Sequence, residues 1–129
     1  IIGKLLSKAE EVKKNAYAPY SKFKVGAAIY TENGNIYTGC NVENASFGGT
    51  ICAERGAAMT AIASEGKTSF KLIAIASDAE EPAPPCAICR QFLSEFVDED
   101  TQVYLVSSKS KTLRHHDFAT LMPYSFTEF

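Results

Sequence analysis

Residues 71–77 constrain the fold of this chain more than any other part of its sequence. Leucine, isoleucine and alanine follow one another across residues 72–76, without the polar alternation of a strand that faces water on one side. Such a run is typical of a central strand that is buried on both faces of a sheet. We therefore expect a sheet with helices packed against it, and 129 residues are enough to build it as one domain spanning residues 1–129.

Helical and extended patterns alternate along the rest of the chain. Pro19 limits the first helical pattern, Asn33-Gly34 forms a hairpin turn between two β-rich runs, and Gly66 follows an alanine-rich helical run. Asp117 is expected to cap the last helix. The expected elements are helices over residues 2–16, 52–65, 86–97 and 117–121, and strands over residues 23–31, 35–42, 71–77, 102–106 and 112–113. Their order predicts an α/β fold, a sheet flanked by helices.

Charge and hydropathy exclude two classes of partner. Thirteen Lys and Arg against fifteen Asp and Glu give a net charge of −2, and the lysines are scattered, so we expect no nucleic-acid partner. The longest apolar runs, residues 25–30 and 72–76, are far shorter than the ~20 residues of a membrane-spanning helix. The first residues show no charged leader before an apolar stretch, so we expect no secretory signal and a cytoplasmic protein.

Four cysteines, at positions 40, 52, 86 and 89, carry the strongest chemical signal. In a reduced cytosolic chain, the spacing of Cys86 and Cys89 indicates a metal site or a redox dithiol rather than a structural disulfide. The pair falls at the expected start of a helix, where unpaired N–H groups and the positive end of the helix dipole stabilise thiolates. This pair alone leaves both possibilities open.

Cys52 favours the metal interpretation, because it begins the other central helix and so brings a third thiolate. Three thiolates leave the fourth position of a tetrahedral Zn²⁺ for water, as in catalytic zinc sites. Glu54 would lie beside that water only if Cys52 is the first residue of its helix and Glu54 turns inward from the first turn. Arg55 is the expected donor to a thiolate sulfur, where it would offset the negative charge of the site, and Arg90 is a weaker candidate.

Four motifs and a C-terminal segment resemble the small zinc-dependent cytidine deaminases of pyrimidine salvage. The motifs are APYSKFKVGAA at residues 18–28, GCNVEN at 39–44, CAER at 52–55 and PCAICRQ at 85–91, and PYSF follows at 123–126. They occur in the family's order and are together highly specific. The chain is similar to the branch with three cysteine ligands, because Cys52 stands where the broader deaminase pattern has a histidine. Residues 47–50 lie in a loop where the family varies.

The resemblance implies a three-layer α/β/α sandwich with a mixed central sheet, assembled as a homotetramer whose active sites draw on neighbouring subunits. It implies one Zn²⁺ per subunit, held by Cys52, Cys86 and Cys89, with Glu54 as the catalytic proton shuttle. The other implied site residues are Phe23 at the base pocket, Asn41 and Glu43 at a ribose hydroxyl, backbone groups near Ala53 at the pyrimidine, and Phe126 in a neighbour's pocket. The implied reaction is hydrolytic deamination of cytidine and deoxycytidine to uridine and deoxyuridine, with release of ammonia.

Two further groups of residues could in principle bind a metal. Cys40 would be the fourth ligand of a closed zinc site, whereas a small buried thiol is the more common role for a cysteine on a strand. His115 and His116 are adjacent, and adjacent residues rarely face one ion. We therefore expect Cys40 to be a core thiol and the two histidines to face solvent.

Three alternative functions use the same motifs. A non-enzymatic zinc module would need Cys40 as its fourth ligand and would give Glu54 no function. A redox protein would oxidise and reduce the dithiol of Cys86 and Cys89 and would bind no metal. A blasticidin-type deaminase would act on a modified cytosine nucleoside. The sequence favours ordinary nucleosides, because the pair of Asn41 and Glu43 matches the ribose-binding pattern.

Overall fold

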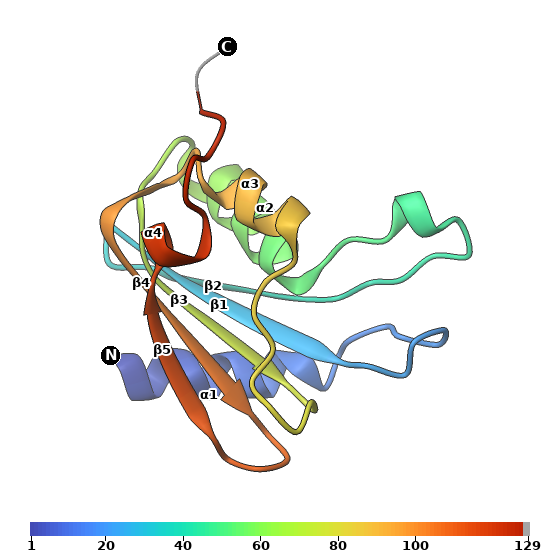
Figure 1. Cartoon of the computed structure of the whole chain (residues 1–129). Helices are drawn as coiled ribbons and strands as arrows, with labels where there is room; N and C mark the ends of the chain where they lie inside the picture. The colour runs from blue at the N-terminus through green and yellow to red at the C-terminus, as the bar shows by residue number, and fades with distance from the viewer. Residues whose placement is uncertain (128–129) are drawn as a thin grey trace.

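The computed structural model describes residues 1–127, which form one five-stranded sheet and its covering helices (Figure 1). The strands are β1 (Val25–Thr31), β2 (Ile36–Cys40), β3 (Phe70–Ser77), β4 (Val97–Ser107) and β5 (Leu113–Asp117). The helices are α1 (Ile2–Lys13), α2 (Ala53–Glu65), α3 (Ala87–Leu93) and α4 (Phe118–Leu121), with a short 3-10 turn, η1 (Phe47–Gly49). Among the residues described, no helix combines the length and the apolar character that crossing a membrane would demand.

The central strand of the sheet is β3, as the run at residues 71–77 predicts. The strand order is β2-β1-β3-β4-β5. β3 pairs with β4 in parallel and with β1 antiparallel, and the two outer pairs are antiparallel. The sheet is therefore mixed, and α3 forms the crossover between the two parallel strands, a connection that a parallel pair requires.

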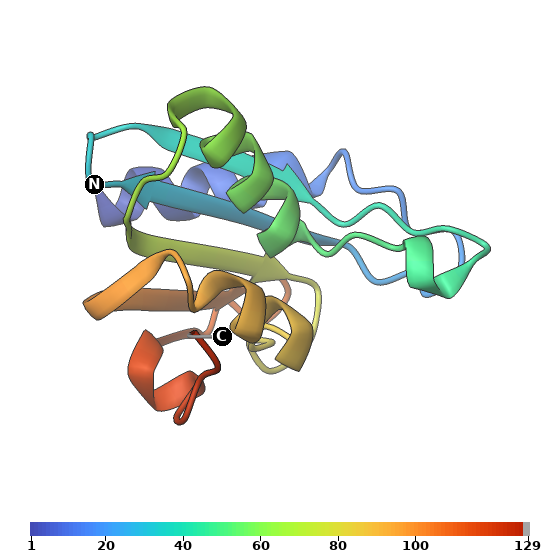
Figure 2. The same ribbon diagram turned by 90° about the horizontal axis from the view of Figure 1, so that it is seen from above.

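Helices cover both faces of this sheet, which confirms the three expected layers (Figures 1 and 2). On one face, α1 packs against Ala28, Ala74 and Ala76. On the other face, the buried alanines of α2 pack with Ile73 and Ile75. Neighbouring residues of β3 thus point into two different cores, and this explains why its sequence is apolar throughout.

Two glycines allow α1 and α2 to lie directly on the sheet. A Cβ atom at Gly26 in β1 would lie 2.1 Å from the carbonyl oxygen of Ala9 in α1. A Cβ atom at Gly39 in β2 would lie 2.3 Å from the backbone nitrogen of Ala57 in α2. Any larger residue would push the helix away from the strand at either position. The contact at Gly39 therefore sets the distance between α2 and the sheet. It thereby also sets the position of the start of α2, where Cys52 and Glu54 lie.

The expected helix over residues 86–97 is too long, and the expected strand over residues 102–106 is too short. The helix ends at Leu93, and β4 already begins at Val97. The reason is a tertiary contact, because the carbonyl of Phe96 accepts a hydrogen bond from the N–H of Phe70 at 2.7 Å. This bond takes the chain out of the helix and into the sheet beside β3.

The elements near the C-terminus also differ from the sequence prediction. β5 extends to Asp117, since it pairs with β4 along its length, instead of ending at residue 113. Asp117 does precede α4, but its side chain makes no capping hydrogen bond. Its carboxylate instead accepts a hydrogen bond from Gln102 Nε2 on the neighbouring strand, at 2.7 Å. The expectation of a side-chain cap is therefore wrong.

Candidate metal centre and active site

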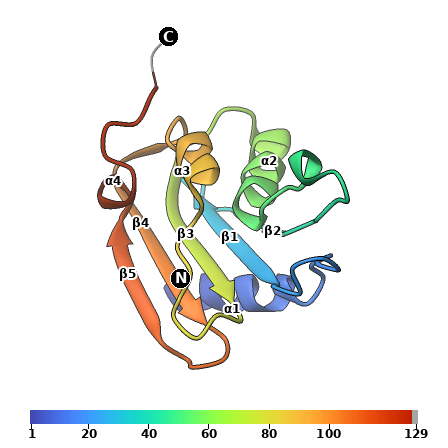
Figure 3. The same ribbon diagram turned by 45° about the vertical axis from the view of Figure 1, so that its right-hand side comes forward.

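Two helix starts bring three cysteines together, because α2 and α3 lie side by side on one face of the sheet (Figure 3). Cys52 is the N-cap of α2 and Cys86 is the N-cap of α3, both with extended backbone. Cys89 is the third residue of α3. Side chains at an N-cap and at the third helical position lie close together, as they do in capping boxes. The Cys-x-x-Cys spacing therefore directs two thiols to one point, where Cys52 adds the third.

The three thiols have the spacing of a zinc site. Their Sγ atoms lie within 4.8 Å of one another, and those of Cys52 and Cys86 are 3.8 Å apart. Two Zn–S bonds of ~2.3 Å at a tetrahedral angle separate their sulfurs by about 3.8 Å, whereas a disulfide bond is ~2.05 Å long. The donor set and its spacing thus fit Zn²⁺, and three protein ligands leave one tetrahedral position open.

In the part of the chain that the structure describes, no further cysteine or histidine joins this cluster. Cys40 is half-buried at the end of β2, outside the cluster, so a closed site with four thiolates is not formed. His115 is exposed on β5, as expected, and its ring stacks on that of Tyr104 with the centroids 4.6 Å apart. His116 is half-buried and is therefore less exposed than expected.

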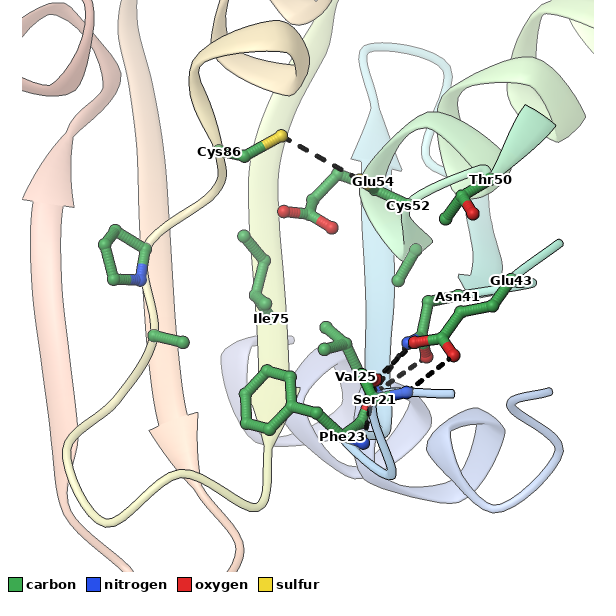
Figure 4. Close-up of a pocket in the computed structure, with 13 residues that line it drawn as sticks. Ser21, Phe23, Val25, Asn41, Glu43, Thr50, Cys52, Glu54, Ile75 and Cys86 are labelled. Atoms are coloured by element: carbon green, nitrogen blue, oxygen red, sulfur yellow. Dashed lines mark hydrogen bonds between the residues drawn. The ribbon is translucent and has the colours of Figure 1, made fainter. Parts of the chain in front are cut away.

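Glu54 is the second residue of α2 and lines the cavity beside the cysteines (Figure 4). Cys52 is not the first residue of the helix, as the sequence-based condition required, but its N-cap. Because Cys52 precedes the helix in extended conformation, its side chain and that of Glu54 need not diverge. Glu54 is 5% exposed. Burial raises the pKa of its carboxyl to about 7, and the nearby Cys52 thiolate adds to the shift. A carboxyl with this pKa can both accept and return a proton near neutral pH.

Arg55 contributes a positive charge at the cluster of three cysteines. Its Nη2 donates to Cys52 Sγ at 3.5 Å and to the carbonyl of Thr50 at 3.3 Å. The pKa of the Cys52 thiol is lowered to about 5, first by a hydrogen bond from Cys89 and then by those from Arg55 and Cys86. The bond to Cys52, together with burial, raises the pKa of Cys89. Cys52 therefore ionises before Cys89, and a thiolate is the form that binds a metal.

Cys52, Cys86 and Glu54 line a cavity of about 250 Å³ (Figure 4). Four of the expected substrate-binding residues line the same cavity, namely Phe23, Asn41, Glu43 and Ala53. Figure 4 shows Phe23, Asn41 and Glu43 on the side away from Cys86 and Glu54. Apolar side chains form much of the wall between them, including Val25, Ile75 and Pro84. The cavity thus has a reactive end at the cysteines and a polar end at Asn41 and Glu43.

The Asn41 side-chain amide is hydrogen-bonded to backbone groups of the same chain. Its Oδ1 accepts from the N–H of Val25 at 2.9 Å, and its Nδ2 donates to the carbonyl of Phe23 at 2.8 Å. These bonds hold residues 23–25 at the edge of the cavity. An amide nitrogen carries two hydrogens, so one N–H of Asn41 is left for another acceptor.

Sequence reasoning missed two polar residues that also line the cavity, Ser21 and Thr50. Ser21 lies two positions before Phe23 within the motif at residues 18–28, and membership of that motif was the signal available for it. Thr50 lies in the variable loop, where no pattern marks it. Its Oγ1 accepts a hydrogen bond from the N–H of Asn44 at 3.1 Å, which shapes the loop above the cavity.

Phe126 does not line this cavity in the described chain. Its N–H donates to Gln91 Oε1 at 3.2 Å and its carbonyl accepts from Gln91 Nε2 at 2.6 Å, while the residue is 64% exposed. Arg90 donates to the carbonyls of Pro85 and Leu121, so it braces the loop before Cys86 and does not bind a thiol there. The C-terminal segment is thus tied to the helix that carries two of the cysteines.

The fold and the site together define an α/β/α protein in which three clustered thiols that fit Zn²⁺ lie beside a buried carboxyl, the arrangement of a zinc hydrolase. Residues 2–105 match the family described as the cytidine and deoxycytidylate deaminase zinc-binding region. The chain belongs to this family of zinc-dependent cytidine deaminases. The resemblance found in the motifs is therefore confirmed.

Individual relatives match this chain over most of its length. It is 42% identical over 127 residues to the cytidine deaminase of Sporosarcina psychrophila, with 98% of this chain and 92% of that protein covered. The crystal structure of the cytidine deaminase from Burkholderia pseudomallei matches with a TM-score of 0.91 and 38% identity, covering 98% of this chain and 99% of that one. The Mycobacterium tuberculosis enzyme matches with a TM-score of 0.82 and 32% identity over 98% of both chains.

Proposed function

We propose that this chain catalyses the hydrolytic deamination of cytidine and deoxycytidine to uridine and deoxyuridine, with release of ammonia. One observation carries the proposal: the buried Glu54 lines the same cavity as Cys52 and Cys86 of the cysteine cluster. A metal site with an open position and a buried acid beside it is suited to activating water. The relatives named cytidine deaminase support the choice of substrate.

The cluster and Glu54 divide the chemistry between them. Cys52, Cys86 and Cys89 would hold Zn²⁺, which when bound lowers the pKa of a water from about 15.7 toward ~7. Glu54 takes a proton from the attacking water and donates it to ring N3 of the cytosine. Glu54 then takes the proton of the hydroxyl group now on C4 and gives it to the amino group, so that the C4–N bond breaks, ammonia leaves and a carbonyl forms. A pKa of about 7 suits a carboxyl that must act first as a base and then as an acid.

Residues elsewhere in the cavity are assigned to binding the nucleoside. Phe23 would contact the base, backbone groups at Ala53 would bind the pyrimidine edge, and Asn41 and Glu43 would bind a ribose hydroxyl. Their common position in the cavity supports this assignment. Arg55 touches neither base nor sugar in this scheme, and offsets the negative charge of the thiolates through its bond to Cys52.

The test of the proposed function compares the zinc-loaded wild-type chain with the variant Glu54→Gln. Turnover is followed by the loss of ultraviolet absorbance of cytidine, and zinc is measured in the same sample. We expect Glu54→Gln to retain zinc and to lose roughly 10²–10⁴-fold in kcat, the usual contribution of a general acid–base group. The control is Glu95→Gln, the same substitution at an exposed position, which should keep full activity. Full activity of Glu54→Gln would refute the mechanism.

We further propose a homotetramer in which a neighbouring subunit completes each active site. Three exposed aromatic residues support an interaction surface, since Phe47 is 80%, Tyr124 is 103% and Phe126 is 64% exposed in the single chain. Phe126 is the residue that would enter the neighbour's pocket. Light scattering measures the assembly directly, and a fully active monomer would refute it.

We also propose that the substrate is a free nucleoside and that the protein is cytoplasmic. The net charge of −2 supports a small substrate over a nucleic acid, whose phosphates require a basic surface. The four free cysteines support a reducing compartment, where thiols persist. A binding assay with labelled single-stranded DNA and RNA tests the first point, and we expect no binding in either case.

A further inference from the structure

The Glu43 carboxylate is held by three hydrogen bonds from one short segment. Its Oε1 accepts from the backbone N–H groups of Tyr20, at 3.0 Å, and Ser21, at 3.1 Å. Its Oε2 accepts from the Ser21 hydroxyl (Figure 4). A carboxylate offers about four acceptor positions, so about one is left for a donor from outside the chain.

The Ser21 hydroxyl also connects this carboxylate with the residue expected at the base. Its Oγ accepts from the N–H of Phe23 at 3.0 Å. Ser21, Phe23 and Glu43 line the same cavity. One hydroxyl therefore sets the orientation of the carboxylate and of the backbone that carries the aromatic ring. Groups that are fixed in this way before a ligand arrives bind it with less loss of conformational entropy.

The residue after Ser21 has an unusual backbone conformation, in the segment whose groups bind Glu43. Lys22 has a φ of 62°, in the left-handed region that residues other than glycine rarely adopt. Strained backbone of this kind is concentrated at ligand sites. The hydrogen bond from the Ser21 side chain, helped by the charge of Lys22, lowers the pKa of Glu43. The carboxylate therefore remains an anionic acceptor, for which a hydroxyl is a suitable donor.

We propose that Ser21 is a positioning residue that holds the Glu43 carboxylate as the acceptor for a secondary hydroxyl of the sugar. The inference rests on the proposed function and deepens it, because it assigns sugar selectivity to the pair of Ser21 and Glu43, apart from the chemistry at Glu54. A sugar with secondary hydroxyls donates into the remaining acceptor position. A sugar that lacks secondary hydroxyls cannot form this hydrogen bond, so Ser21 and Glu43 do not increase its affinity.

The test measures binding, so that it does not depend on turnover. Calorimetry gives the Kd of cytidine and of 2′,3′-dideoxycytidine for zinc-loaded Glu54→Gln, with and without Ser21→Ala. We expect Ser21→Ala to weaken cytidine binding about tenfold, a typical effect of one charge-assisted hydrogen bond, and to leave binding of the dideoxy compound nearly unchanged. Ser21→Thr keeps the hydroxyl and should restore cytidine binding. Should Ser21→Ala fail to fold or to hold zinc, Glu43→Gln is the second variant, with the same selective loss expected.

Equal weakening for both nucleosides would overturn the inference, because Ser21 would then be a general structural residue. Unchanged cytidine binding in Ser21→Ala, or binding of neither nucleoside by the starting chain, would overturn it as well. The proposed function fails in a different way. A wild-type chain that binds cytidine with the expected dependence on Ser21 but produces no uridine would refute the deaminase activity and leave this inference standing.

Discussion

The Arg55 guanidinium lies 3.5 Å from the sulfur of Cys52 and donates a hydrogen bond to it. Three thiolates and one Zn²⁺ carry a net negative charge, which opposes the ionisation of a water at the open position. A cation bound to one of the sulfurs offsets part of that charge, and the two helix N-termini add to the effect. The chemistry proposed for Glu54 thus depends on the residue next to it in sequence.

Replacing Arg55 with alanine should weaken zinc binding by roughly 10–100-fold, since groups that hydrogen-bond to metal ligands typically contribute that much to affinity or activity. Competition with a chelator of known affinity measures the effect. Arg114→Ala is the matched control, because Arg114 pairs with Glu81 at the surface. Identical zinc affinity in the wild type and in Arg55→Ala would show that the guanidinium has no role at the metal.

The ligand set can be tested with two cysteine variants of opposite outcome. Cys89→Ala should lose zinc, because Cys89 is one of the three clustered thiols. Cys40→Ala should keep one zinc per chain, because Cys40 lies outside the cluster. Metal analysis after a chelator wash measures both. Zinc loss from Cys40→Ala would instead indicate a closed site and a non-enzymatic protein.

Glu65 should make the folded state less stable as the pH falls into the acidic range. Its carboxylate accepts hydrogen bonds from Asn35, Asn33 and Thr31, and these bonds, that of Asn35 foremost, lower its pKa from 4.5 to about 2. A lowered pKa stabilises the folded state above pH 4.5, and this contribution is lost as the pH falls toward 2. Glu65→Gln should therefore have a lower Tm than the wild type, by a margin that shrinks over this interval. A margin independent of pH in thermal unfolding would contradict the prediction.

The metal site was predictable from sequence because helix starts are local features. Cys52 and Cys86 occupy N-caps that their own neighbours determine, and Cys89 follows at a fixed helical spacing. The end of α3 was not predictable in this way. The end of this helix depends on Phe96. The ring of Phe96 packs on that of Phe70 with the centroids 5.5 Å apart, and its carbonyl accepts a hydrogen bond from the N–H of Phe70. Such a contact between distant positions leaves no periodic pattern in the chain.

The same reason explains the residues that sequence reasoning missed in the cavity. The hydrogen bond from Ser21 to Glu43 joins positions that are 22 residues apart. Each residue alone has the pattern of an ordinary loop or strand edge. Their pairing depends on the turn at Lys22, whose positive φ is unusual for lysine. The resemblance to a known family located the motif, but the role of Ser21 within it needed the folded chain.

Phe126→Ala should raise the KM for cytidine about fivefold and leave zinc in place, because one aromatic contact contributes on the order of 1 kcal/mol. Gln91→Ala should act in the same direction, since Gln91 binds both the N–H and the carbonyl of Phe126. Steady-state kinetics and light scattering on the same samples measure affinity and assembly. An unchanged KM in a tetrameric Phe126→Ala variant would remove Phe126 from the site without affecting the metal chemistry.

The most direct test of a zinc-dependent deaminase is a titration of the metal-free chain with Zn²⁺, with uridine and ammonia measured after addition of cytidine. The three clustered thiols and the buried Glu54 predict that the initial rate rises linearly with zinc and stops rising at one equivalent per chain. Uridine and ammonia should form in equal amounts. Turnover by the metal-free chain, or a chain that binds one zinc and forms no uridine, would contradict the account.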